Sequence, residues 1–207
     1  ELCSALSIGG LTPSIGLIDA AIKMQQAEIH VMIRHRAGNF IYTDNDISIM
    51  EKDIEMAAQS GANGVVFGCL TADNLIEQKQ TNHLTDIAKD NGLEVTFHRA
   101  FDFVSEPQNN LELLIDLGVN RLLTSGGKKT AIDGLKAINM LTKAAKNRIE
   151  IMAGSGINAE NATSFLTTGV SALHFSGDAY FINADGLGMG DNTQTNKQKI
   201  DAMSKLF

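Results

Sequence analysis

The strongest constraint on the fold is a unit that recurs along the chain: a short apolar run, then small residues, then a helical pattern. Residues 148–157, with the sequence RIEIMAGSGI, show this unit most clearly. The run lacks the alternation of polar and apolar residues that marks a strand with one solvated face. We therefore expect a parallel strand that is covered on both faces, followed by a helix over 158–168.

Seven strand-like runs and seven helical patterns make up the chain. The runs end near Cys3, Arg34, Phe67, His98, Thr124, Met152 and Phe175. The helical patterns lie over 14–26, 44–59, 79–90, 107–117, 130–146, 158–168 and 197–206. Strands that alternate with helices at this spacing are typical of βα units around a parallel sheet.

A closed (β/α)8 TIM barrel needs eight strands, and the sequence shows seven. Because the chain begins inside the first strand-like run, we expect one further strand–helix unit before Glu1, missing from this sequence. An open doubly wound sheet is the alternative α/β fold, since it tolerates seven strands. No run is followed by a GxGxxG fingerprint with a distal acid, so we favour the barrel. We predict a single domain over 1–207, with a mobile, Gly-rich loop over 177–196.

Composition narrows the class of protein. The 207 residues, 43% of them hydrophobic, can bury the core of one full-sized domain. A formal net charge of −7 argues against nucleic acid or an anionic membrane surface as the main partner. No apolar run approaches the length of a membrane span. Two cysteines do not form a disulfide framework, so we predict reduced thiols and a cytoplasmic location.

Functional groups of a barrel gather at the carboxyl ends of its strands. Alternation with a period of two predicts that the mouth holds Glu1, Arg34, His98, Glu150 and His174, with Thr124 or Ser125 beside them. One interpretation is a structural network in which Arg34 neutralises Glu1 or Glu150, since charges inside a barrel are costly unless paired. The other is a catalytic site: the carboxylates and His98 act as general acid and base, for instance Glu150 with His98, and Arg34 orients an anionic substrate.

Small-residue loops after the later strands suggest an anion site. Backbone N–H groups of Gly154, Ser155 and Gly156 lie close to an expected helix N-terminus. Ser176 and Gly177 follow the last strand, and paired glycine loops at this place are the usual phosphate site of a TIM barrel. The loop containing Ser125, Gly126 and Lys128 offers further candidate donors. The alternative for residues 154–156 is a tight strand-to-helix turn without a ligand.

Several long strings resemble the CutC family of copper homeostasis proteins. They are ELCSALSIGGLTPS at 1–14, HVMIRHRAGNFIYT at 30–43, GANGVVFGCLTADN at 61–74, VTFHRAFD at 95–102, LIDLGVNRLLTSGG at 114–127 and RIEIMAGSGI at 148–157. The resemblance implies a (β/α)8 barrel with a strand and helix before the ELC motif, a cytoplasmic location, homo-oligomers and a role in copper handling. Two positions depart from the family pattern: His35 replaces Pro, and Asn39 replaces Asp, which removes a carboxylate that could bind a cation.

Cu(I) favours thiolate and thioether ligands. The resemblance implies Cys3, in the ELC motif, as a copper ligand. Cys69 is a second candidate metal ligand. It follows a strand two positions away, so the two thiols are expected roughly 9–10 Å apart at ordinary strand spacing. Loop movement or the intervening Met32 would be required for both to bind one ion. The alternative is that Cys3 is a small buried hydrophobic residue and Cys69 an ordinary loop thiol.

Three functions fit these patterns. The first is a CutC-type cytosolic barrel that binds Cu(I) through Cys3. The second is an enzyme that acts on a small phosphorylated or carboxylated metabolite by acid/base chemistry. The third is a scaffold that acts through the surface of its dimer alone.

Overall fold

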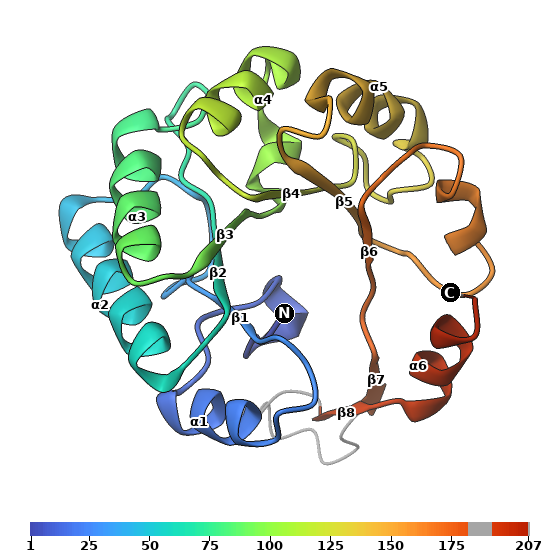
Figure 1. The fold of residues 1–207 in the computed structure, drawn as a ribbon, viewed down its shortest axis with the longest axis horizontal. Helices are drawn as coiled ribbons and strands as arrows, with labels where there is room; N and C mark the ends of the chain where they lie inside the picture. Colours follow the sequence, from blue (N-terminus) through green and yellow to red (C-terminus); the bar gives the residue numbers. More distant parts are fainter. Residues whose placement is uncertain (182–191, 207) are drawn as a thin grey trace.

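The computed structural model describes residues 1–181 and 192–206. Six parallel strands form the main sheet: β1 (His30–Met32), β2 (Gly64–Phe67), β3 (Glu94–Phe97), β4 (Arg121–Thr124), β5 (Glu150–Gly154) and β6 (Ala172–His174). They neighbour one another in chain order. Figure 1 shows the strands curving round a common centre, with the helices on the outside.

Residues near Leu2 extend this sheet beyond β1. Leu2 pairs in parallel with Val31. The backbone N–H of Leu2 donates to the carbonyl oxygen of His30 at 2.8 Å, and that of Met32 donates to the carbonyl oxygen of Leu2 at 3.0 Å. This segment is the first of the predicted strand-like runs. Within the described residues the sheet does not close, so the fold is confirmed as a curved parallel α/β sheet, and closure into (β/α)8 stays a prediction.

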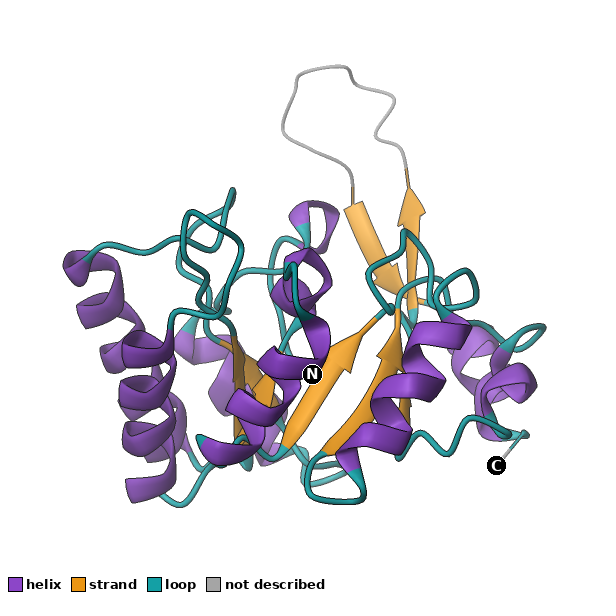
Figure 2. Cartoon of the chain, turned by 90° about the horizontal axis from the view of Figure 1, so that it is seen from above, coloured by secondary structure: helices purple, strands orange, loops and turns teal. Residues whose placement is uncertain are grey.

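The strand order decides against the doubly wound alternative. In a doubly wound sheet the order reverses at a switch point, and helices cover both faces. Here the order runs from β1 to β6 without reversal. In Figure 2 the arrows of the parallel sheet point to the side on which β7 and β8 project, away from the viewer of Figure 1.

The α-helices lie close to their predicted positions. They are α1 (Ile15–Lys23), α2 (Asp44–Ser60), α3 (Gln78–Asp90), α4 (Pro107–Asp116), α5 (Leu135–Ala145) and α6 (Lys197–Ser204). Short 3-10 helices occur as η1 (Leu6–Ile8), η2 (Arg99–Phe103) and η3 (Ala162–Phe165). No helix among these residues has the combined length and apolarity needed to cross a membrane.

The helix predicted over 158–168 is wrong, because only η3 forms there. Asn158 Oδ1 accepts the N–H of Glu160, and Asn161 Oδ1 accepts the N–H of Asn158. These local bonds from asparagine side chains to the backbone stabilise a turn at this place.

Residues 177–196, predicted as a mobile loop, contain an antiparallel pair. Strand β7 (Asp178–Phe181) pairs with β8 (Asn192–Thr195), so the two ends of the segment are ordered strands. The rest of the predicted loop, 182–191, lies outside the described residues.

The two faces of the sheet differ in composition. Outward-facing side chains belong to the main apolar cluster with the helices: Val31, Ile33, Val65, Phe67, Val95, Phe97, Leu122 and Ile151. The alternate residues face inward and are outside that cluster; they include His30, Met32, Arg34, Gly64, Val66, Gly68, Thr96, His98, Leu123, Met152 and Gly154. The inner face therefore mixes polar, sulfur-containing and glycine residues.

Glycine at the start of β2 is required by close packing on the inner face. A Cβ on Gly64 would lie 2.4 Å from Nδ1 of His30 and 2.8 Å from the carbonyl oxygen of Glu94. We predict that Gly64→Ala destabilises the fold by about 1–3 kcal/mol, because the backbone of β3 cannot move aside freely. The free energy of unfolding in urea measures this loss.

The matched control is Gly16→Ala, in the first turn of α1, where a Cβ meets nothing within 4 Å. Alanine there favours the helix by about 0.5–1 kcal/mol. Equal stability of Gly64→Ala and the unaltered protein would contradict the packing described for the inner face.

Candidate functional site

Arg34, Gly68 and His98 form one row across the inner face of the first three strands. Met32, Val66 and Thr96 are paired in register across β1, β2 and β3. Two residues further along each strand, at the carboxyl ends, the row continues with Arg34, Gly68 and His98. A Cβ on Gly68 would lie 2.7 Å from Nδ1 of His98, so the imidazole leans over this glycine.

His98 is buried and carries an unpartnered ring nitrogen. Its Nδ1 accepts the N–H of Ala100 at 3.2 Å, so Nε2 is the nitrogen that carries the proton in the neutral ring. Nε2 is buried without a hydrogen-bond partner in the described structure. Burial lowers the pKa of His98 to about 4; Glu1 acts to raise it, and Arg34 to lower it. The imidazole is therefore neutral at pH 7, and its Nε2 is a hydrogen-bond donor. The sequence analysis gave His98 the role of a general acid or base and did not predict this role.

Arg34 is buried, and its guanidinium donates hydrogen bonds to backbone carbonyl oxygens. Nη1 donates to the carbonyl oxygens of Ile8 and Gly10, each at 3.0 Å, and Nη2 donates to that of Gly38 at 2.9 Å. No carboxylate among the described residues forms an ion pair with it. The predicted network in which Arg34 neutralises Glu1 or Glu150 is therefore wrong. Nε of Arg34 is buried and unpartnered.

The ring of Phe40 contacts both members of this row. It lies 5.1 Å from Cζ of Arg34 and 4.8 Å from the centre of the His98 ring. Phe103, 61% exposed, lies 5.9 Å away from Phe40 on the outer side. An aromatic wall thus borders Arg34 and His98 at the carboxyl end of the strands.

Glu1, Cys3 and His174 form a second polar group on the inner face. One carboxylate oxygen of Glu1 accepts the thiol of Cys3 at 3.1 Å, and the other lies 3.4 Å from Nε2 of His174. Burial alone would raise the pKa of Glu1, but hydrogen bonding and charge from His174 lower it to about 2. Burial, with the neighbouring Glu1, raises the pKa of Cys3. At pH 7 this group holds a carboxylate and a protonated thiol.

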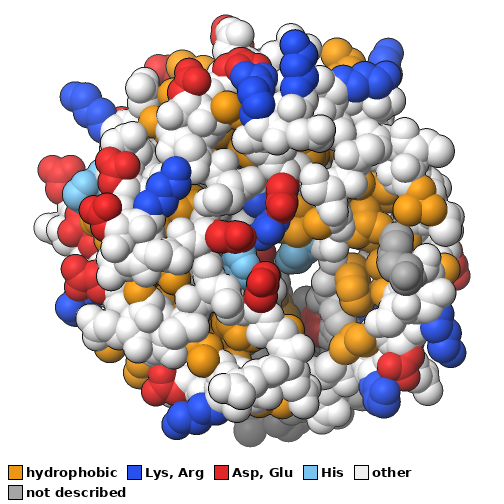
Figure 3. Space-filling view, viewed as in Figure 1, with side chains coloured by type: hydrophobic (Ala, Val, Ile, Leu, Met, Phe, Trp, Pro, Cys, Tyr) orange, Lys and Arg blue, Asp and Glu red, His pale blue; other side chains and the backbone are white. Residues whose placement is uncertain are grey.

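The prediction that Glu150 lies at the mouth is wrong. Glu150 begins β5, so it is four residues and about 13 Å from the carboxyl end of that strand. Its Oε2 accepts Nε of Arg121 at 2.6 Å, and Arg121 also reaches Glu94 at 3.4 Å. These residues begin neighbouring strands. Figure 3 views this amino-terminal end, and charged and histidine side chains gather at its centre.

The donors predicted around Ser125 and Gly126 are occupied by a side chain that sequence reasoning missed. Asp102 accepts the hydroxyl of Thr124 at 2.6 Å, the backbone N–H of Ser125 at 2.9 Å and that of Gly127 at 3.1 Å. The N–H of Gly126 donates to the hydroxyl of Thr124. The loop therefore binds an anion, but that anion is the protein's own carboxylate. The string HRAFD, in which Asp102 follows His98, was the available signal.

The other predicted anion loops are neighbours. Gly154 pairs with His174, so residues 154–156 and 176–177 follow adjacent strands. Ser155 adopts a left-handed φ of 89°, and its hydroxyl donates to the carbonyl oxygen of Lys129 at 2.8 Å. The hydroxyl of Ser176 donates to Asp178, which places a carboxylate beside the site. Anion binding at Gly154, Ser155, Gly156, Ser176 and Gly177 stays a prediction.

The two cysteines lie on opposite faces of the sheet. Cys69 is fully buried in the apolar cluster between β2 and the helices, whereas Cys3 is on the inner face with Glu1. The prediction that Cys69 joins Cys3 around one metal ion is therefore wrong. A Cβ on Gly10 would lie 3.2 Å from Sγ of Cys3 and 3.4 Å from Cε of Met32, so both sulfur-containing side chains contact this glycine.

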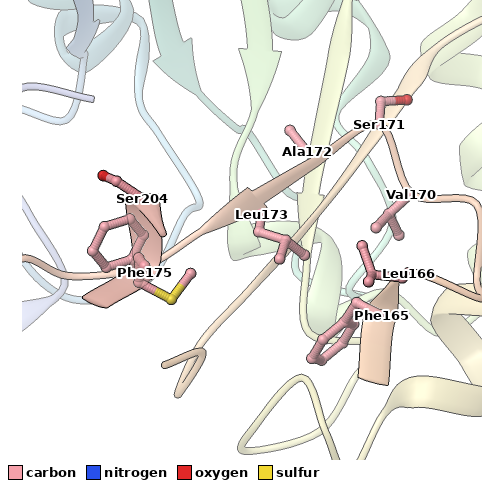
Figure 4. Close-up of a pocket in the computed structure, with 9 residues that line it drawn as sticks. Phe165, Leu166, Val170, Ser171, Ala172, Leu173, Phe175 and Ser204 are labelled. Carbon is pink, nitrogen blue, oxygen red and sulfur yellow. The ribbon is translucent and has the colours of Figure 1, made fainter. Parts of the chain in front are cut away.

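A pocket of about 510 Å³ lies on the outer side of β6 (Figure 4). Its lining is mainly apolar and comes from η3, β6 and α6: Phe165, Leu166, Val170, Ser171, Ala172, Leu173, Phe175, Met203 and Ser204. No titratable side chain lines it. This pocket therefore offers no acid or base to a ligand.

Comparisons with known proteins give a consistent result. The model of the CutC family matches residues 1–179. A CutC family protein of Glaesserella parasuis serovar 5 is 42% identical over 211 residues, which cover 100% of this chain and 86% of that protein. A crystal structure of a CutC protein named for copper homeostasis, from Streptococcus agalactiae, is 38% identical with a TM-score of 0.79, covering 84% of this chain and 85% of that one. An aldolase with 15% identity and a TM-score of 0.62, covering 77% of this chain and 73% of its own, is similar in fold alone.

The neutral, buried state of His98 predicts a pH dependence of stability. The pKa falls from an ordinary 6.5 to about 4 on folding, so the unfolded chain binds more protons between these values. The contribution of His98 is fully present above pH 6.5 and is lost as the pH falls towards 4. Between pH 7 and pH 5 it amounts to about 2 kcal/mol.

Urea unfolding of the protein and of His98→Gln at both pH values measures this difference. The variant should lose less stability on acidification, because glutamine does not titrate. Parallel losses in the two proteins would show that His98 is protonated, or exposed, in the folded state.

Proposed function

The chain belongs to the CutC family, and on that basis we propose that it serves copper homeostasis by binding Cu(I) at Cys3. The relative from Streptococcus agalactiae is named for this role. The observation that supports a copper site in this chain is the approach of two sulfur-containing side chains, Cys3 and Met32, to Gly10 on the inner face. Thiolate and thioether are the ligands that select Cu(I).

The donor set available to copper is small. No group of three or more His, Cys, Asp or Glu side chains in the described part of the chain is arranged to hold a metal ion. Cys69 faces the helices and cannot join. A thiolate from Cys3 with the thioether of Met32 is therefore the set that we propose, and copper is cargo at this site.

Proton release accompanies this binding. Cu(I) binds the thiolate, so the thiol proton of Cys3 must leave. The carboxylate of Glu1, which accepts that proton in a 3.1 Å hydrogen bond, is the first acceptor on its path. Burial and Glu1 raise the pKa of the thiol, so Cu(I) competes with a tightly held proton and its affinity rises with pH.

We propose a cytoplasmic location and a homo-oligomeric assembly as part of the same role. Both cysteines are free thiols in the structure, which accords with a reducing compartment. The family resemblance is the support for the homo-oligomer.

A second candidate is an enzyme that uses the same inner face on a small carboxylated or phosphorylated metabolite. The observation that favours it is the buried, unpartnered Nε2 of His98, since such groups are rare unless a ligand or water satisfies them. In this version the acid/base pair is Glu1 with His174, which are 3.4 Å apart, and Glu150 takes no part.

The copper proposal predicts that Cys3→Ser removes tight Cu(I) binding and that Met32→Leu weakens it. Competition titration against a Cu(I) chelator under anaerobic conditions measures the affinity. Cys69→Ala is the matched control, because it removes the other thiol from a site that faces the helices, and its affinity should equal that of the unaltered protein. Unchanged affinity in Cys3→Ser would contradict the proposal.

A further inference from the structure

Two buried hydrogen-bond donors in the Arg34–Gly68–His98 row have no acceptor. Nε of Arg34 and Nε2 of His98 are both unpartnered in the described structure, and both residues are 5% exposed. A buried donor without a partner destabilises the fold, so two of them in one row indicate that something other than the described residues accepts from them.

The row brings the side chains that carry these donors to the same level of the inner face. Arg34 and His98 follow β1 and β3, and Gly68, which has no side chain, follows the intervening strand β2. The His98 ring leans over Gly68, which is the direction of Arg34. Phe40 contacts the guanidinium of Arg34 and the imidazole of His98, so both side chains adjoin one aromatic ring.

The charge of this row favours an anion. The guanidinium of Arg34 adjoins neutral groups: backbone carbonyls, the face of Phe40 and the side chain of Tyr42. The carboxylate of Glu1, which also lies on the inner face, contacts Cys3 and His174 and forms no ion pair with Arg34. A buried cation without a paired carboxylate is stabilised by an anionic ligand more strongly than by a neutral one.

We infer that Arg34 and His98 bind the carboxylate of a small organic acid, whose apolar part packs on Phe40. One carboxylate oxygen accepts from Nε2 of His98, which acts as a neutral donor, and the charge of Arg34 compensates that of the ligand. The inference deepens the second candidate function by naming its substrate class and by giving His98 the role of donor instead of base. It is independent of copper binding at Cys3, so either can fail alone.

The test is binding of propionate, measured by calorimetry and by the NMR shift of the His98 side-chain nitrogens. Propionamide has the same shape without the charge, and inorganic phosphate is the alternative anion. Propionate should bind and move the Nε2 signal of His98, and propionamide and phosphate should bind more weakly.

Two variants at His98 separate donation from mere shape. His98→Phe removes the donor and should weaken propionate binding by about tenfold or more, whereas His98→Gln keeps an amide donor and should stay within about threefold. His83→Phe is the matched control, because His83 is exposed and pairs with Glu51 outside the inner face. Thermal unfolding verifies that each variant is folded.

Three results would overturn the inference. Equal propionate affinity in His98→Phe and the unaltered protein would show that His98 is not the donor. Tighter binding of phosphate than of propionate would assign the row to another class of anion. No shift of the Nε2 signal at saturating propionate, measured without any substitution, would mean that only water satisfies these donors.

Discussion

The guanidinium of Arg34 is the interaction on which the inner face depends. It is buried, and burying a charge is costly unless hydrogen bonds replace its water. Hydrogen bonds to the carbonyl oxygens of Ile8, Gly10 and Gly38 replace that water. These three residues belong to two different loops, which the guanidinium connects. Gly10 is the residue that Cys3 and Met32 contact, and Gly38 precedes the Phe40 ring that covers Arg34 and His98. One charge thereby positions both the sulfur-containing side chains and the aromatic wall.

Much of the scaffold and half of the site could be predicted from the sequence. Apolar runs in the sequence predict buried parallel strands. Alternation with a period of two placed Arg34 and His98 on the inner face, where the structure has them. The same alternation misplaced Glu150, because it gives the face of a residue but not its height along the strand. It also could not show that Cys69 turns towards the helices, or that Asp102 fills the loop at Ser125. Those outcomes depend on contacts between segments distant in the chain.

The two proposed ligands use neighbouring but separate chemistry. Sulfur at Cys3 and Met32 suits a soft cation, whereas Arg34 and His98 suit an oxyanion. Glu1 adjoins both, since it binds the thiol of Cys3 and raises the pKa of His98 through its charge. Loss of the Cys3 thiol proton on metal binding would therefore remove a hydrogen bond to Glu1 and change the interaction of Glu1 with His174. The inner face, and not the apolar pocket outside β6, is where these functions converge.

The proposed binding of a carboxylate depends on His98 being a neutral imidazole whose proton is on the buried, unpartnered Nε2. Long-range 1H–15N correlation NMR of the histidine side chains at pH 7 tests it most directly, because the two ring nitrogens differ in shift between tautomers and between charge states. We predict a neutral ring with a protonated Nε2 and an unprotonated Nδ1, which accepts the N–H of Ala100. A cationic ring, or a proton on Nδ1, would contradict it.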